Sequence, residues 1–177
     1  MGLNGDVYIG LGSNIGDPVK NLKSAISAIA EISDFLVPSS VYVSSAAGFT
    51  SQPNFFNAAC KIGTTLSPFE LLHSLLLIEN QLGRSRAFVN SPRLIDLDIL
   101  LWGDLRLEAP HLRIPHPRLH ERGFALAPLL EIDSSLVHPY SHIELRDFYE
   151  RLPAAEKPMA LIIRELATIP TRLPSRG

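Results

Sequence analysis

Residues 93–102 read RLIDLDILLW, and this stretch decides the fold. Apolar and acidic residues alternate along it, and the side chains of a β-strand point alternately to its two faces. One face is predicted to carry an apolar stripe of Ile95, Leu97, Ile99 and Leu101. The opposite face is predicted to carry Leu94, Asp96, Asp98 and Leu100. The stretch therefore predicts a strand with one face in a core and two neighbouring carboxylates on the other face.

Outward from this strand, the chain alternates between strand and helix patterns. β-Branched and apolar residues predict strands over residues 7–12, 35–44 and 55–65. Apolar residues at helical spacing predict helices over residues 18–32 and 68–82. Each begins with a proline that follows a capping residue, Asp17 or Ser67. The order β-α-β-β-α-β is that of a ferredoxin-like sandwich, an α+β fold whose antiparallel four-stranded core sheet carries both helices on one face. The other face of the sheet is then free to carry a site.

The remainder of the chain is punctuated by prolines. Gly103-Asp104 predicts a tight hairpin turn that leads from the fourth strand into residues 105–107. Short helices are expected over residues 117–121, 125–131 and 145–152. We expect one domain over residues 1–152 and a loosely attached C-terminal extension over residues 153–177.

Composition bounds the class of protein. The chain has 177 residues, of which 46% are hydrophobic and 19% charged, as in a globular domain. Its formal net charge of −2 gives no basic field that would attract nucleic acid or an acidic membrane. No apolar run approaches the ~20 residues that cross a bilayer, and no secretory signal pattern is present. The single cysteine, Cys60, is expected to be a buried free thiol, and a cytoplasmic location is expected.

Asp96 and Asp98 are the first candidates for chemistry. Carboxylates two residues apart on one face lie about 6–7 Å apart along a strand, and such a pair is costly on an apolar strand without compensation. Salt bridges to nearby arginines are one explanation. A Mg²⁺ site that also takes phosphate oxygens is the other. Arginines bracket the pair, and their guanidinium groups match phosphate geometry: Arg84, Arg86, Arg93, Arg118 and Arg122.

A second candidate site is a set of aromatic and amide side chains. Phe55 and Asn57 share a face of the predicted third strand, and Phe124 ends the arginine-bearing segment. Aromatic rings can enclose a planar heterocycle while an amide reads its edge. Packing in the core is the alternative explanation for these phenylalanines. No P-loop follows the glycine turn at residues 12–14, so a nucleotide would bind through arginines and metal.

Five stretches together resemble one family, the 6-hydroxymethyl-7,8-dihydropterin pyrophosphokinases of folate biosynthesis. In chain order they are YIGLGSNIGD at 8–17, QPNFFNAA at 52–59, LLLIENQLGRSR at 75–86, PRLIDLDILLWG at 92–103 and IPHPRLHERGFALAPLLEI at 114–132. The resemblance implies the ferredoxin-like fold and in-line attack of the pterin hydroxymethyl oxygen on the β-phosphorus of ATP, which releases AMP. It also implies two Mg²⁺ ions bridged by Asp96 and Asp98, with small molecules as partners and neither nucleic acid nor membrane.

The resemblance further assigns residues to roles. Arg84 and Arg93 resemble the catalytic arginines of the family, beside Asp96 and Asp98. The pterin side is implied to be Gly48, Phe55, Asn57 and Phe124. The ATP side is implied to be Glu79, Arg86, Arg93, Ile99, Arg113, His116 and Arg122.

The chain departs from the family pattern in the loop before the aspartate strand. Residues 87–91 read AFVNS, without the arginine and tryptophan that family members carry there. Two other functions therefore stay open. One is a metal-dependent phosphoesterase that uses the same aspartate pair, although no residue that activates water is evident. The other is a non-catalytic module that binds pterin or nucleotide.

Overall fold

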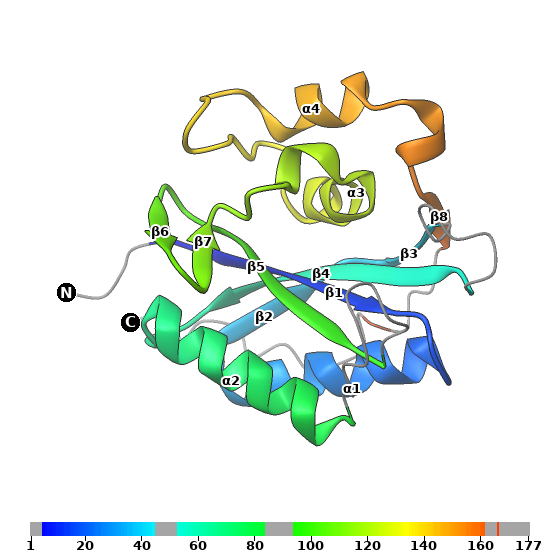
Figure 1. Ribbon diagram of the computed structural model, residues 1–177, viewed down its shortest axis with the longest axis vertical. Helices are drawn as coiled ribbons and strands as arrows, with labels where there is room; N and C mark the ends of the chain where they lie inside the picture. The colour runs from blue at the N-terminus through cyan, green and yellow to red at the C-terminus, as the bar shows by residue number, and fades with distance from the viewer. Residues whose placement is uncertain (1–4, 45–52, 84–93, 162–165, 167–177) are drawn as a thin grey trace.

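The structure is a computed structural model that describes residues 5–44, 53–83, 94–161 and 166. One β-sheet lies between two helical layers (Figure 1). Helices α1 (Pro18–Glu31) and α2 (Pro68–Gln81) cover one face. Helices α3 (Gly123–Ile132) and α4 (Leu145–Arg151) lie over the other. No helix in the described ranges is both long and apolar enough to cross a membrane.

The sheet has six strands in the order β5-β1-β4-β3-β8, with β2 also paired to β4, and every pair is antiparallel. The strands are β1 (Val7–Ser13), β2 (Phe35–Pro38), β3 (Val41–Ser44), β4 (Phe55–Gly63), β5 (Asp96–Trp102) and β8 (Met159–Leu161). With α1 and α2 on one face, this arrangement confirms the predicted ferredoxin-like α+β sandwich.

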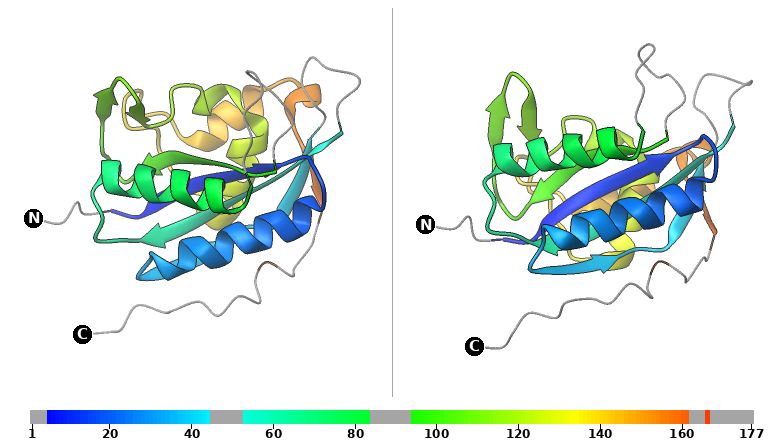
Figure 2. Two further views of the ribbon diagram at one scale, coloured as in Figure 1. Left: turned by 60° about the horizontal axis from the view of Figure 1, so that its bottom comes forward. Right: turned by 90° about the horizontal axis from the view of Figure 1, so that it is seen from below.

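Helices α1 and α2 begin where the sequence predicts. The Asp17 side chain accepts a hydrogen bond from the Lys20 amide at 3.1 Å. In the capping box of α2, Ser67 and Glu70 each accept from the other's backbone amide. The two helices run side by side along one face of the sheet (Figure 2). These caps satisfy amides that have no partner within the helix, which explains why both helices start at these residues.

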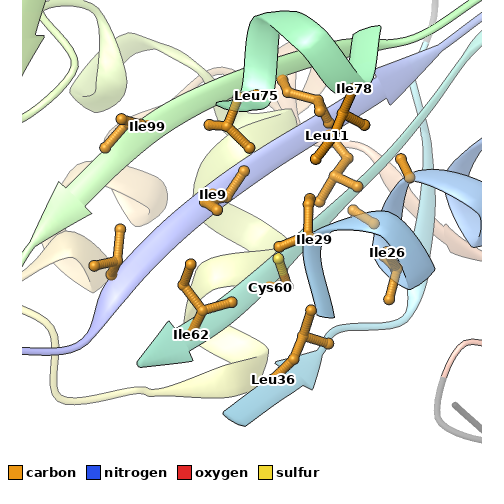
Figure 3. Packing of buried hydrophobic residues seen from close by; sticks show 14 of the residues in the cluster. Ile9, Leu11, Ile26, Ile29, Leu36, Cys60, Ile62, Leu75, Ile78 and Ile99 are labelled. Carbon is orange, nitrogen blue, oxygen red and sulfur yellow. The ribbon is translucent and has the colours of Figure 1, made fainter. Parts of the chain in front are cut away.

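Between these helices and the sheet lies the main core (Figure 3). Its apolar side chains come from alternate strand positions and from one stripe of each helix: Ile9, Leu11, Ile26, Ile29, Ile62, Leu75, Ile78 and Ile99. Cys60 is fully buried among them as a free cysteine, as predicted. Burial raises the pKa of its thiol, so it remains protonated and poorly nucleophilic.

Strand β5 keeps the predicted alternation only over its first part. Ile95, Leu97 and Ile99 lie in the helix-side core, but Leu101 packs with Leu100 in the second cluster under α3. The prediction that Leu101 shares a face with Ile99 is therefore wrong. The reason is a shift in register at Leu100, typical of a β-bulge, where Tyr8 pairs with Leu101 but Ile9 pairs with Ile99.

The opposite face of the sheet is covered over part of its area, so the expectation that it is free is wrong there. A second apolar cluster joins this face to α3 and α4 and includes Tyr8, Ala59, Leu100, Leu101, Leu119, Leu126, Leu129 and Leu145. Helix α3 is apolar almost all round, and a helix of that kind is stable only when buried. The three predicted short helices are present as α3, α4 and the 3-10 turn η1 (Leu119–Glu121).

Two predicted strand features differ in the structure. The single strand expected over 35–44 is two strands, because the chain breaks after Pro38 and the Ser39 hydroxyl accepts from the Ala59 amide at 2.9 Å. The tight turn expected at Gly103-Asp104 is present, since the Leu105 amide donates to the Trp102 carbonyl oxygen at 2.9 Å, but residues 105–107 do not continue as a hairpin with β5. Instead, β6 (Leu107–Ala109) and β7 (Leu112–Ile114) pair with each other in a separate two-stranded sheet.

The C-terminal part continues beyond α4. The 3-10 turn η2 (Ala154–Glu156) leads to β8, which pairs with β3, and Leu166 is buried in the main core. The division into a domain over 1–152 and an extension over 153–177 stays a prediction.

Candidate active site

Two rows of paired residues cross the sheet beside the aspartates. Asn57, Gly12 and Asp96 form one row, and Ala59, Gly10 and Asp98 form the next. Directly paired residues in antiparallel strands point to the same face. Because β1 contributes only glycines to these rows, it places no side chain of its own on this face there. The Leu100 side chain lies over Gly10, and Gly12 lies between Asn57 and Asp96.

Gly10 and Gly12 are needed for different reasons. A Cβ atom at Gly10 would lie 2.9 Å from the Leu100 Cδ1 atom, so glycine makes room for the bulged residue of β5. A Cβ atom at Gly12 would lie 3.4 Å from the Asn57 Oδ1 atom and would fill the space between Asn57 and Asp96. Sequence reasoning missed both residues as part of the site, although the alternating glycines of YIGLGS were a visible signal.

Arg122 joins the carboxylates to a histidine. Its Nη1 atom lies 3.7 Å from Asp98 Oδ2 and 3.4 Å from His116 Nε2. The Asp98 side chain is 43% exposed, and an ion pair of this length and exposure contributes little to stability. The salt bridge expected as an alternative role for the pair is thus present at Asp98.

His116 is placed by the bulge of β5. Its backbone amide donates to the carbonyl oxygen of Leu100 at 2.9 Å, which brings the ring beside the aspartates. Burial, helped by Arg122 and Arg118, lowers the pKa of His116 to about 4, while Asp96 acts in the opposite direction. The ring is therefore neutral at pH 7.

The tautomer of His116 follows from its contacts. Its Nδ1 atom accepts from the Arg118 amide at 3.1 Å, so the neutral ring carries its proton on Nε2. The Nε2 atom then faces Arg122 Nη1 as a second donor, 3.4 Å away. Two facing donors suit an anionic oxygen that accepts from both, such as a phosphate oxygen.

The candidate pterin residues lie on β4 and α3. Asn57 is buried, and its Nδ2 atom donates to the Ser44 hydroxyl at 2.9 Å, which fixes the orientation of the amide. Phe55 lies two residues earlier on the same face of β4. Phe124 lies in the first turn of α3, and the centroid of its ring is 5.7 Å from the Arg122 guanidinium carbon. Phe124 is thus brought together with the residue that contacts both Asp98 and His116.

Other candidate residues lie away from the carboxylate face. The Ile99 side chain is in the main core, on the opposite face from Asp98. Glu79 of α2 is fully buried, and its Oε1 atom accepts from the Leu97 amide at 2.7 Å along the outer edge of β5. Ile99 lies two residues from Leu97, so its backbone polar groups face this same edge. Arg113 is exposed on β7, opposite Glu108. Gly48, Arg84, Arg86 and Arg93 lie outside the described residues.

The donor set at the aspartates fits a magnesium ion. Among the described residues, no group of three or more His, Cys, Asp or Glu side chains could enclose a metal ion. Mg²⁺ is commonly held by one or two carboxylates, with water and substrate phosphates as its remaining ligands. Asp96 and Asp98 are two such carboxylates on one face of β5, and Arg122 and His116 lie beside them.

Comparison with known proteins places the chain in a family. Residues 8–134 match the model of the family described as 7,8-dihydro-6-hydroxymethylpterin-pyrophosphokinase (HPPK). A 2-amino-4-hydroxy-6-hydroxymethyldihydropteridine pyrophosphokinase of Aquifex aeolicus is 42% identical over 142 residues, which are 80% of this chain and 89% of that protein. The chain belongs to the 7,8-dihydro-6-hydroxymethylpterin-pyrophosphokinase family, as the sequence resemblance predicted.

Longer relatives contain the same domain. The folic acid synthesis protein fol1 of Pneumocystis carinii is 42% identical over 150 residues, which are 84% of this chain and 20% of that protein. The chain thus spans about a fifth of the length of this relative. A Plasmodium falciparum HPPK-DHPS crystal structure matches with a TM-score of 0.66 and 15% identity, over 83% of this chain and 45% of that chain. The structural match shows the shared fold.

Proposed function

We propose that this chain transfers a pyrophosphoryl group from ATP to 6-hydroxymethyl-7,8-dihydropterin, giving the pterin diphosphate and AMP in folate biosynthesis. The observation that carries the proposal is the assembly of Asp96 and Asp98 beside Arg122 and neutral His116, in a chain of the pyrophosphokinase family. Carboxylates for a hard cation and donors for phosphate oxygens thus lie at one place on the sheet.

The residues of the site have separate roles in the proposed reaction. Asp96 and Asp98 would hold two Mg²⁺ ions, which would neutralise phosphate charge and orient the triphosphate. Arg122 and the Nε2–H group of His116 donate to phosphate oxygens. The pterin hydroxymethyl oxygen forms a bond to the β-phosphorus as the bond to the α,β-bridging oxygen breaks, and the hydroxyl proton is released. Positioning and charge neutralisation supply most of the rate.

The pterin lies between Phe55 and Phe124, with its edge against the Asn57 amide. Support comes from Ser44, which fixes that amide, and from the proximity of Phe124 to Arg122. Gly48 belongs to the same subsite. Arg84 and Arg93 act as catalytic arginines. Arg86 and Arg113 contact ATP, and Ile99 contacts it through its backbone at the edge of β5. Glu79, fully buried at the Leu97 amide on this edge, lies near the adenosine. The partners are small molecules, with neither nucleic acid nor membrane, and a cytoplasmic location stays a prediction.

Product analysis separates this function from its alternatives. The purified chain is incubated with ATP, Mg²⁺ and hydroxymethyldihydropterin, and the products are resolved by anion-exchange chromatography. AMP and pterin diphosphate in equal amounts are expected. Inorganic phosphate as the sole product would indicate a phosphoesterase, and binding of both ligands without turnover would indicate a non-catalytic module.

A further inference from the structure

Residues 153–161, called here the C-terminal segment, connect the end of α4 to β8 and lie beyond residue 134, where the family match ends. The segment leaves α4, passes the start of α3 and reaches the side of β3 away from β4 (Figure 1). It therefore links two elements that carry candidate site residues, α3 with Phe124 and β3 with Ser44.

The first contact of the segment is with the start of α3. A Cβ atom at Gly123 would overlap the carbonyl oxygen of Glu156, and it would lie 3.2 Å from the Leu152 Cδ1 atom. Gly123 joins Arg122 to Phe124, the two residues that approach the carboxylates and the expected pterin position. The Glu156 carbonyl of the segment is thus in direct contact with Gly123, which lies between Arg122 and Phe124.

The other contacts hold the segment in place. Lys157 Nζ donates to the Glu150 carbonyl oxygen at 3.1 Å and lies 5.3 Å from the centroid of the Tyr149 ring, which ties the segment to α4. Strand β8 pairs with β3, where Ala160 is opposite Tyr42. Tyr42 is in turn opposite Asn57. The segment therefore spans from the Phe124 side of the site to the Asn57 side.

We propose that the C-terminal segment positions the substrate site, with the Glu156 carbonyl against Gly123 setting where Arg122 and Phe124 lie relative to Asp98 and Asn57. The proposal rests on the proposed function, because it assigns the segment a role in binding that function's substrates. A misplacement of about 1 Å in such residues can reduce turnover by up to a hundredfold. Residues 153–161 act through Arg122 and Phe124 and do not touch the reacting atoms.

Gly123→Ala tests the contact because two effects oppose each other. Gly123 is the first residue of α3, and its backbone has no positive φ, so alanine alone would favour the helix and raise Tm. With the segment in place, the added methyl group meets the Glu156 carbonyl and displaces the start of α3. We expect KM for the pterin to rise about tenfold, with an unchanged circular dichroism spectrum. An unchanged KM with a raised Tm would overturn the proposal.

Lys157→Met tests the same contact, between Glu156 and Gly123, by a change in the C-terminal segment. It removes the hydrogen bond to Glu150 and the charge over Tyr149 but touches no site residue. We expect KM for the pterin to rise with little change in kcat, whereas a merely structural lysine would lower Tm alone. Lys20→Met, at an exposed position on α1, is the matched control and should behave as wild type.

The double variant with Gly123→Ala and Lys157→Met shows whether the two residues act through the same contact. If Gly123 and Lys157 act through one contact, the KM increase of Gly123→Ala should be smaller in the Lys157→Met background than in the wild-type background. Independent, multiplicative effects, or a Lys157→Met variant equal to Lys20→Met, would overturn the role of the segment while the wild-type enzyme stays active. A wild-type chain that forms no AMP and pterin diphosphate would overturn the proposed function itself and this proposal with it.

Discussion

Asp96 and Asp98 lie in different settings although they share a face. Asp98 has Arg122 at 3.7 Å, whereas the charge of Asp96 favours protonation of the His116 ring. Both pair with glycines of β1, Asp96 with Gly12 and Asp98 with Gly10, and the Leu100 side chain lies over Gly10. Within the described residues, the two carboxylates therefore lie beside one arginine and one neutral histidine.

Replacing either aspartate should abolish turnover and leave the fold intact. Asp96→Asn and Asp98→Asn remove a negative oxygen ligand with little change of volume, so we expect kcat to fall by about a hundredfold or more. The measurement is AMP formation at saturating ATP and Mg²⁺, with circular dichroism as the check on folding. Asp34→Asn, at an exposed position, is the matched control. Near-normal activity in either site variant would show that the metal assignment is wrong.

His116 should make stability depend on pH in a defined window. Its folded pKa is lowered from 6.5 to about 4, chiefly by burial. The unfolded chain therefore binds this proton first, so stability is fully present above pH 6.5 and is lost as pH falls toward 4. We expect Tm of wild type to fall over this window and Tm of His116→Asn to fall less, as measured by differential scanning fluorimetry. His138, whose pKa is also lowered, remains in both proteins. An equal fall of Tm in wild type and in His116→Asn would contradict a lowered pKa for His116.

At the residue scale, alternation predicted which face of β5 carries the carboxylates but not where that alternation ends. Ile95, Leu97 and Ile99 follow the period of two, and Leu101 does not. The bulge depends on pairing with β1, where Gly10 admits Leu100, and such non-local pairing leaves no local pattern in β5. The arrangement of His116 beside the aspartates likewise depends on the Leu100 carbonyl, so spacing alone did not reveal it.

Helix α3 links the site to the sheet through its last turn. The Glu131 carboxylate accepts from the Ser40 amide at 3.0 Å, from the Ser40 hydroxyl at 2.8 Å and from the Tyr42 hydroxyl at 2.8 Å. Nearby, Tyr8 donates to Asp133 at 3.1 Å. These bonds hold the far end of the helix whose first turn carries Phe124.

Glu131→Ala should destabilise the protein more than Tyr42→Phe does. The first variant leaves two side chains and one amide without their acceptor, and the second removes a single donor. We expect a loss of about 1–2 kcal/mol in the free energy of unfolding for Glu131→Ala, measured by urea denaturation. Equal losses in the two variants would show that the bonds to Ser40 contribute nothing.

At the element scale, the local sequence predicted where the helices start but not where strands end, because strand ends depend on pairing between strands. Asp17 and the Ser67 capping box place both helix starts, because capping is local chemistry. Pro38 predicted an irregularity, but the split into β2 and β3 depends on the Ser39 hydroxyl reaching Ala59 across the sheet. The hairpin expected after Gly103 failed because residues 107–109 pair with residues 112–114 instead of returning along β5.

The whole molecule is a sheet with helices on both faces. The repeating β-α-β-β-α-β pattern was sufficient to predict the first layer. The second layer was not predicted, because the apolar stretch of α3 shows that it is buried but not which surface covers it. In this arrangement Asp96 and Asp98 come from β5, and His116 and Arg122 come from the segment that leads into α3.

In the proposed reaction, the β- and the γ-phosphoryl groups of ATP move together to the pterin. The most direct test of this reaction is transfer of label from ATP labelled with ³²P at the β-phosphorus, followed by separation of nucleotide and pterin products. We predict that the label leaves the nucleotide completely and appears in the pterin product, with unlabelled AMP in equal amount. Label retained in ADP, with a pterin monophosphate as product, would contradict the account.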